Sequence, residues 1–279
     1  MHTEVKEVHR PETLEEAVRL LARPDVRTAP LYISPRPLEG LVDAEAAVDL
    51  SGLGLDTVRV TDTGLTLGAA ATLEALLASP MGGTPAGALI CEACRTTAHS
   101  GIRAVASVGG AVTAGEPSDL LLALLALDAV CVLRAPAPRQ APLADLSIGA
   151  GELLVEVRIP VARGPLGAAL ERVARTPRDR SIVAAAAALE LDGSVCARAR
   201  LAVSGVGAKA MRWASAEKVL EGRPPTAERI AAAAATVETE ARPEGDHLGS
   251  AEYRRAMGAV VARRALAAAW DRATSRKGR

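Results

Sequence analysis

The sequence predicts an α+β protein built from two unequal parts, and three observations support this prediction. Helical and strand patterns alternate up to about residue 165. Beyond that point, two long apolar stretches flank Asp192-Gly193, a dipeptide typical of tight β-hairpins, and three helical patterns follow them. With 279 residues, of which 49% are hydrophobic, the chain is also long and apolar enough to bury a large core.

The composition excludes several classes of function. The 33 basic and 33 acidic residues leave no net charge, whereas a dedicated nucleic-acid binder has an excess of basic residues. Two Trp, two Tyr and no Phe are too few aromatic residues for base stacking. No stretch approaches the length of apolar sequence that spans a membrane, so we expect neither a membrane span nor a nucleic-acid partner. The first residues contain no apolar signal core, and the four cysteines are typical of free thiols, so we expect a cytoplasmic protein.

The first predicted element is a helix over 13–23, with Thr13 as its N-cap and Glu16 as the capping-box partner. The proline-rich stretch that follows is predicted to be a loop or a very short strand. Further along we expect a strand at 46–50, a hairpin over 57–70, helices over 73–79, 86–98 and 118–128, and strands at 129–133 and 153–159. The glycine-rich stretch 102–112 looks too broken for a regular element, and 135–142 looks like a linker.

The second part is predicted to begin with an antiparallel hairpin. Residues 195–203 alternate, with Arg198 and Arg200 on the polar face. The alanine run before Asp192 could be helical by composition, but the turn signal favours a strand. Three helices are expected after the hairpin, over 213–221, 226–241 and 250–273.

Motifs for metal binding and for nucleophilic catalysis are weak. Cys91 and Cys94 form one CxxC inside a predicted helix, without the second pair or the His ligands that a zinc or iron–sulfur site needs. Two small apolar residues one helical turn apart are the favoured interpretation. The four histidines have no spaced partners, and no nucleophile elbow is present for a Ser–His–Asp triad. We therefore expect no metal ligand and no catalytic residue in this chain.

The strongest candidate site is the segment Ser107-Val108-Gly109-Gly110-Ala111. Two adjacent glycines allow the backbone to approach a ligand closely and to turn successive N–H groups toward a phosphate. Ser107 adds a hydroxyl, and Asp119 at the start of the next helix could accept a hydrogen bond from a sugar or a ring. Taken alone, a glycine pair more often marks a tight turn between packed elements.

A series of ten segments, in order across residues 8–270, resembles the FAD-binding medium subunit of molybdenum hydroxylases of the xanthine dehydrogenase and carbon monoxide dehydrogenase type. Any one segment alone does not identify this family, but ten segments in the same order do. The segments include HRPETLEEAVRLLA, LTLGAAATLEALLAS, SGIRAVASVGGAV, EPSDLLLALLALDAVCVL, GELLVEVRIP, ERVARTPRDRSIVAAAAALEL and DHLGSAEYRRAMGAVVARRAL.

The resemblance implies a particular fold and a particular role. The fold is a two-lobed PCMH-type FAD-binding fold with α/β lobes at 1–55 and 56–165. A C-terminal α+β module at 166–279, of the CO dehydrogenase flavoprotein type, adds a three-stranded antiparallel sheet and helices. FAD would lie between the lobes. In this family a large subunit carries the molybdenum cofactor and a small subunit carries two [2Fe–2S] clusters. The FAD subunit passes electrons from the clusters to an external acceptor, as the flavoprotein part of an oxidoreductase.

The resemblance also assigns the cofactor contacts. Ser107, Val108, Gly109, Gly110 and Ala111 match the family's second phosphate loop, with Ala111 in place of a polar Asn. The acidic residue that follows this loop in the family is kept as Asp119, and Arg172 replaces the usual Lys further along the chain.

The first phosphate loop departs from the family pattern. A glycine pair is expected there, and the aligned residues are Leu31, Tyr32, Ile33 and Ser34, preceded by Pro30. Pro30 removes one N–H, and the side chains bring Cβ atoms to a place where the backbone has to approach the cofactor. Two functions therefore stay open: a flavin-bearing electron-transfer subunit, or a flavin-free homologue that acts as a structural or assembly subunit of the same kind of complex.

Overall fold

The structure, a computed structural model, describes residues 5–24, 26, 28–32, 44–114, 117–135, 137–177 and 179–275. The chain forms two compact units and passes between them several times. The first unit comprises Met1–Ser79, Ser100–Ala114 and Ala129–Ile159, and the second comprises Pro80–His99, Gly115–Asp128 and Pro160–Arg279. The division into three domains at residues 55 and 165 stays a prediction.

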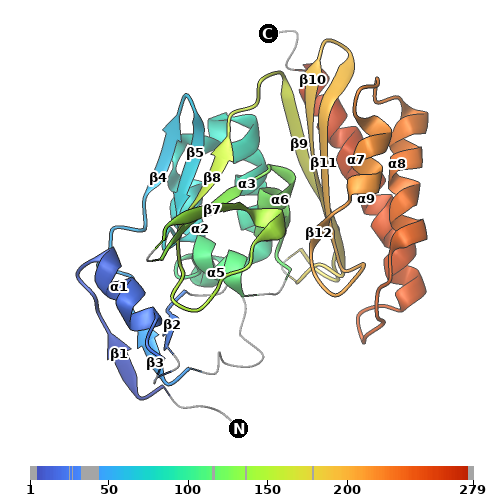
Figure 1. The fold of residues 1–279 in the computed structure, drawn as a ribbon. Coiled ribbons are helices and arrows are strands. Elements are labelled where there is room, and N and C mark those ends of the chain that lie inside the picture. Colours follow the sequence, from blue (N-terminus) through green and yellow to red (C-terminus); the bar gives the residue numbers. More distant parts are fainter. Residues whose placement is uncertain are drawn as a thin grey trace. The chain divides into compact units, whose positions relative to one another are not determined.

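A small parallel sheet opens the first unit. Its strands β1 (Glu7–His9), β3 (Ala46–Val48) and β2 (Thr28–Pro30) lie in the order β1-β3-β2 (Figure 1). Helix α1 (Leu14–Leu21) buries Ala17, Val18 and Leu21 in a core that it shares with the end of β3. Thr13 caps this helix as predicted, because its hydroxyl accepts from the Glu16 N–H at 3.2 Å.

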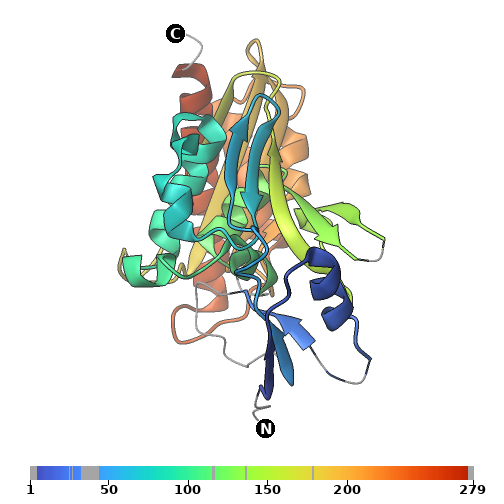
Figure 2. The same ribbon diagram turned by 90° about the vertical axis from the view of Figure 1, so that its left-hand side faces the viewer.

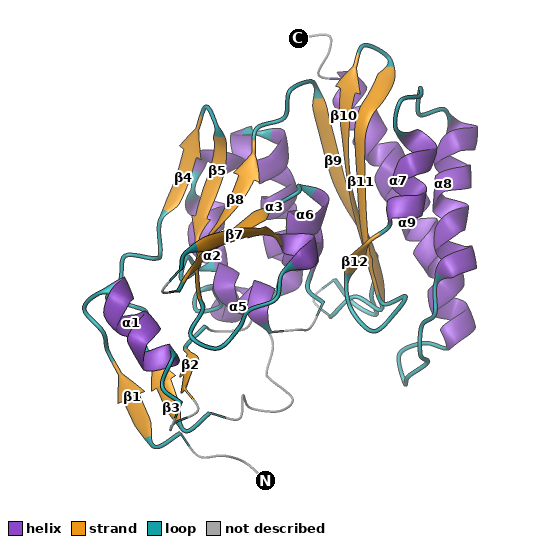
Figure 3. Ribbon diagram, viewed as in Figure 1, coloured by secondary structure: helices purple, strands orange, loops and turns teal. Residues whose placement is uncertain are grey.

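A five-stranded sheet forms the rest of the first unit, in the order β4-β5-β8-β6-β7. Figure 3 labels β4, β5, β8 and β7 of this sheet. The strands are β4 (Val58–Thr61), β5 (Gly64–Gly68), β8 (Leu153–Pro160), β6 (Val130–Arg134) and β7 (Arg139–Pro142). The β4–β5 hairpin, blue in Figure 2, is confirmed. The prediction of a linker at 135–142 is wrong in part, because Arg139–Pro142 pairs with β6, although this strand begins directly after Pro138 and ends at Pro142. Pro142 is tolerated because β7 is an edge strand.

Short helices complete the first unit: α2 (Leu73–Ala78), α4 (Ser100–Arg103), α5 (Val108–Thr113) and the 3₁₀ turn η2 (Leu143–Asp145). The expectation that 102–112 holds no regular element is therefore wrong. Helix α5 forms despite its two glycines because the Ser107 hydroxyl caps it, accepting from the Gly110 N–H at 3.1 Å. Its first five residues are also buried, so packing contributes more than intrinsic helix propensity.

Among the described residues, the second unit contains an antiparallel sheet of four strands in the order β12-β11-β10-β9, whereas the resemblance implied three. The additional strand is the short β12, which pairs with β11. Its strands are β9 (Leu166–Val173), β10 (Val183–Asp192), β11 (Val195–Ser204) and the two-residue β12 (Met211–Arg212). The predicted hairpin at Asp192-Gly193 joins β10 to β11, and Gly193 has a φ of 59°, which suits glycine. The alanine run is thus a strand, as the turn signal indicated.

Helices cover both faces of this second sheet. On one side lie α7 (Ala214–Leu220), α8 (Ala227–Glu240) and α9 (Ala251–Ser275), as predicted (Figure 1). On the other side lie α3 (Pro85–Thr97) and α6 (Asp119–Ala126), with the 3₁₀ turn η1 (Pro80–Gly83) before α3. Strand β10 is buried along nearly its whole length, and its small side chains allow both helical layers to approach. The α+β fold class is confirmed.

Candidate functional site

One candidate site is a groove of about 590 Å³ in the first unit, which we call the α5 groove. Segments that are distant in the sequence line it, among them residues 28–30 and Tyr32 after α1, Gly110 and Thr113 of α5, and residues 148–152 and Leu154 at the start of β8. Its volume lies within the range that is usual for small-molecule sites, about 300–1,000 Å³. The α5 groove therefore brings together residues from both candidate phosphate loops.

Within the candidate loop, the N–H groups of residues 108–111 already have partners within the chain. Val108 donates to the Ala71 carbonyl (2.9 Å), Gly109 to the Ala69 carbonyl (2.7 Å), Gly110 to the Ser107 hydroxyl (3.1 Å) and Ala111 to the Ser107 carbonyl (3.0 Å). A phosphate cannot take the same hydrogens without breaking these bonds. Of the five loop residues, Gly110 is the one that lines the α5 groove.

The N–H groups of the other candidate loop are used in the same way. The Leu31 N–H donates to the Val48 carbonyl at 2.8 Å, and the Tyr32 N–H donates to the Pro30 carbonyl at 3.1 Å. The Leu31 side chain is half exposed, whereas Tyr32 lines the α5 groove. Ile33 and Ser34 lie outside the described residues.

Tyr32 is held at both ends. Its ring lies against Gly109, since a Cβ added at Gly109 would be 2.5 Å from Tyr32 Cδ1. Its hydroxyl donates to the Leu154 carbonyl on β8. Burial raises the pKa of the Tyr32 phenol well above its ordinary value, so the group stays a protonated donor. Tyr32 therefore links the first candidate loop to the second one and to β8.

Asp119 and Arg172 lie together in the second unit. The Arg172 Nε is 3.3 Å from Asp119 Oδ2, and Ser181 Oγ donates to Asp119 Oδ1 at 2.8 Å. Arg172 also donates to Ser181 Oγ at 2.9 Å and to the Pro177 and Asp179 carbonyls. These contacts fasten the start of α6 to the turn between β9 and β10. The expected cofactor contacts of Asp119 and Arg172 stay predictions.

The loop 148–152 is a part of the groove that the sequence interpretation missed. Glu152 binds Arg139 through both carboxylate oxygens, at 2.6 and 2.8 Å, and accepts from the Gly149 N–H at 2.7 Å. These hydrogen bonds lower the pKa of Glu152 to about 2, with Arg139 as the main cause. The signal available in the sequence was the run of alternating glycines in Gly149-Ala150-Gly151 just before a strand.

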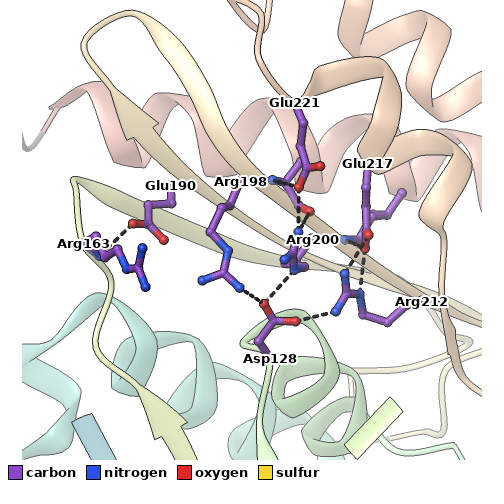
Figure 4. Close-up of polar contacts among 10 residues, drawn as sticks. Asp128, Arg163, Glu190, Arg198, Arg200, Arg212, Glu217 and Glu221 are labelled. Carbon is purple, nitrogen blue, oxygen red and sulfur yellow. Dashed lines mark hydrogen bonds and ion pairs between the residues drawn. The ribbon is translucent and has the colours of Figure 1, made fainter. Parts of the chain in front are cut away.

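A second cluster of charges lies in the second unit, around Asp128 (Figure 4). Arg198 and Arg200 donate to Asp128 Oδ2 at 2.6 and 2.7 Å, and Arg212 donates to Oδ1. Glu217 and Glu221 bind Arg212 and Arg200 in turn, each at 2.7 Å. Three guanidinium groups are thus matched by three carboxylates, so the cluster has no surplus charge with which to attract an ionic ligand.

Among the described side chains, no group of three or more His, Cys, Asp or Glu could hold a metal ion. Cys91 and Cys94 lie in α3, and both are buried, as are Cys131 and Cys196. None of the described helices is both long enough and apolar enough to cross a bilayer.

Comparison with known proteins identifies the class of this chain. The family described as FAD binding domain in molybdopterin dehydrogenase matches residues 3–162, and the CO dehydrogenase flavoprotein C-terminal domain matches residues 168–269. These two matches, together covering most of the chain, define an FAD-binding subunit of the oxidoreductase type. The resemblance inferred from the sequence is confirmed.

Individual relatives agree with this class. The carbon monoxide dehydrogenase medium chain of Afipia carboxidovorans is 32% identical, over 95% of this chain and 96% of the relative. Subunit alpha of the 6-hydroxypseudooxynicotine dehydrogenase complex of Paenarthrobacter nicotinovorans is 33% identical, over 80% of this chain and 79% of its own length. A structure of Cu,Mo-CO dehydrogenase in its cyanide-inactivated form matches with a TM-score of 0.88 at 30% identity, covering 98% of this chain and 100% of that one. The chain belongs to the family of FAD-binding medium chains of molybdopterin dehydrogenases.

The α5 groove fits the family's cofactor in one respect and not in another. Its volume and its position between the two candidate loops suit a flavin nucleotide, and Gly110 is open to it. The described N–H groups of the two loops are engaged in the chain's own hydrogen bonds, so they do not fit a pyrophosphate as they stand.

Proposed function

We propose that this chain is the FAD-binding, electron-transfer subunit of a molybdenum hydroxylase-type complex. The α5 groove is the observation that supports the proposal, because it lies where the two candidate loops meet. The residues of the α5 groove would hold FAD, whose redox chemistry would connect the iron–sulfur clusters of a small subunit with an external electron acceptor. A large subunit with the molybdenum cofactor would hydroxylate the substrate.

In this proposal the residues of the chain bind and orient the cofactor. Gly110 gives it close access to α5, with Thr113 one helical turn further on. Arg139 fixes Glu152, and Glu152 in turn fixes the Gly149 N–H, so the opposite wall of the groove is rigid. Ser107, which caps α5, positions Gly110.

The proposal is tested by measuring flavin. The purified protein, alone and with its partner subunits, should show a flavin absorption spectrum and should release FAD on denaturation.

Gly110→Val should reduce the FAD content to a small fraction, since its side chain would enter the groove. Gly207→Ala, at a position with no atoms within 4 Å of an added Cβ, is the control. Circular dichroism should show that both variants are folded. Unchanged FAD in the Gly110 variant would place the site elsewhere.

The packing of Tyr32 against Gly109 favours a second candidate function, that of a flavin-free assembly subunit. In that role the chain would hold its partners together without carrying electrons. A colourless protein that takes up no added FAD, alone or in the complex, would support this second candidate and exclude the first.

Both candidates imply the same partners, a large molybdenum-cofactor subunit and a small iron–sulfur subunit. When they are produced together, the chain should elute in a complex larger than its own 28.6 kDa. Elution as a monomer under those conditions would contradict both candidates. We propose that this complex lies in the cytoplasm, because Cys91, Cys131 and Cys196 are thiols that form no disulfide bond.

A further inference from the structure

The ring of Tyr32 occupies space that a cofactor on the second loop would need. A Cβ at Gly109 would lie 2.5 Å from Tyr32 Cδ1 and 2.7 Å from Cε1, far inside normal contact distance. The glycine at 109 is therefore needed in this structure to admit the aromatic ring. A ligand that contacted Gly109 on the side where a Cβ would stand would overlap with the ring.

The ring is fixed in this place. The Tyr32 hydroxyl donates to the Leu154 carbonyl on β8, and the Tyr32 N–H donates to the Pro30 carbonyl at the end of β2. Leu154 and Pro30 themselves line the α5 groove. Moving Tyr32 would thus break a partly buried hydrogen bond and expose apolar surface of the ring.

We infer that Tyr32 is a specificity-determining residue that closes the Gly109 end of the α5 groove, so that a dinucleotide must displace its ring to bind fully. The inference rests on the proposed function, since it concerns the same groove. While the ring lies against Gly109, the dinucleotide cannot bind along the whole groove. The apparent affinity for the dinucleotide is therefore the intrinsic affinity multiplied by the fraction of molecules in which the ring is displaced. Ligands confined to the Gly110 and Thr113 end meet no such obstacle.

The test is the dissociation constant of FAD, measured by equilibrium dialysis on the full-length chain. Tyr32→Ala removes the ring and should bind FAD at least about tenfold more tightly than the wild type. Tyr32→Phe keeps the ring but loses the bond to Leu154, so it should show a smaller gain. Tyr253→Ala, which truncates the exposed tyrosine of α9, is the matched control and should not change the affinity.

The outcomes separate this inference from the proposed function. If the wild type binds FAD and Tyr32→Ala binds it no better, the inference is overturned and the proposed function stands. If only the variants bind FAD, the inference is supported and the wild-type chain is the flavin-free subunit. If none of them binds FAD, both are overturned.

A second measurement does not depend on any ligand. Gly109→Ala should lower the urea midpoint of the wild type more than that of Tyr32→Ala, because part of the clash is with the ring. The Ala69 carbonyl, 2.9 Å from the added Cβ, accounts for the part that remains. Equal losses in the two backgrounds would show that the ring does not cover Gly109, and would overturn the inference.

Discussion

At the scale of single residues, Asp128 shows how a strained backbone is maintained by its side chain. Its φ of 52° lies in the left-handed region, which Asp tolerates better than most residues. This conformation ends α6, since the Asp128 N–H donates to the Leu125 carbonyl at 3.3 Å. It also directs the carboxylate toward three arginines of β11 and β12. One residue therefore terminates a helix and joins it to the sheet.

Replacing this carboxylate tests its contribution to stability. Asp128→Asn keeps a side chain that tolerates the same φ, but it removes the charge shared by the arginines. We expect the free energy of unfolding to fall by about 2 kcal/mol, since the pairs are only partly exposed. Urea denaturation measures the loss. Asp192→Asn, at an exposed hairpin position, is the control, and a loss as large in the control would contradict this role for Asp128.

The lowered pKa of Asp246 implies that the free energy of unfolding depends on pH. Arg254 and the Leu248 N–H bind its carboxylate, at 2.7 and 2.8 Å, and lower its pKa to about 2. A depressed pKa stabilises the folded state above the unfolded pKa of about 3.9, and this stabilisation is lost as the pH falls through the folded pKa.

We therefore expect Asp246→Asn to be less stable than the wild type at pH 6, by on the order of 1 kcal/mol or less because solvent screens the pair. The difference should shrink steadily between about pH 4 and pH 2. Urea unfolding of both proteins across this range measures it. A difference that is constant with pH would show that the effect is not electrostatic.

At the scale of elements, β9 and α9 pack with their backbones in direct contact. A Cβ at Gly167 would lie 2.0 Å from the Ala269 carbonyl oxygen and 2.3 Å from the Ala273 nitrogen. Neither backbone atom can move away without shifting the helix. The long helix α9 therefore depends on a glycine at this one strand position.

Gly167→Ala should push α9 away from the sheet and lower the free energy of unfolding by more than about 2 kcal/mol. The thermal midpoint followed by circular dichroism measures this loss. Gly207→Ala should be neutral, because nothing lies within 4 Å of its added Cβ. Equal midpoints for the two variants would contradict the close packing.

Local signals predicted most elements, and contacts between distant segments explain the failures. Thr13, Ser118 and the Asp192-Gly193 turn act within a few residues, so their helices and hairpin could be predicted. Helix α5 depends on the Ala69 and Ala71 carbonyls, which lie some forty residues earlier in the chain. Strand β7 pairs with the neighbouring β6, but it ends at Pro142, which argues against a strand until its edge position in the sheet is known. Strand β10 was predicted correctly for a local reason, because the Asp192-Gly193 turn signal outweighs the helix-like composition of its alanine run.

At the scale of the whole molecule, the order of the ten segments predicted the family, but it did not predict that the N–H groups of the candidate loops are already hydrogen-bonded. Resemblance placed Tyr32 and Gly110 at the two candidate loops, and the structure brings both into one groove. It could not show that the N–H groups of 108–111 are engaged, because their acceptors lie in a segment some forty residues earlier or in Ser107 itself. The loop 148–152 was missed for the same reason, since its role arises from packing.

Each of the two units has its own core and its own buried thiols. The alkylation rates of these thiols can therefore show which unit binds FAD in solution. Cys131 lies on β6 of the first unit, and Cys196 lies on β11 of the second. Burial raises the pKa of each thiol to about 12, so alkylation requires the unit to open.

All the described residues that line the α5 groove belong to the first unit, so bound FAD should protect Cys131. At about a hundred times its dissociation constant, FAD stabilises its unit by about 2.7 kcal/mol. The alkylation of Cys131 should then slow by about a hundredfold, while that of Cys196 changes little. Mass spectrometry of both peptides over time measures the two rates. If bound FAD slows Cys196 and leaves Cys131 unchanged, the cofactor lies in the second unit; if it slows both equally, the units open together.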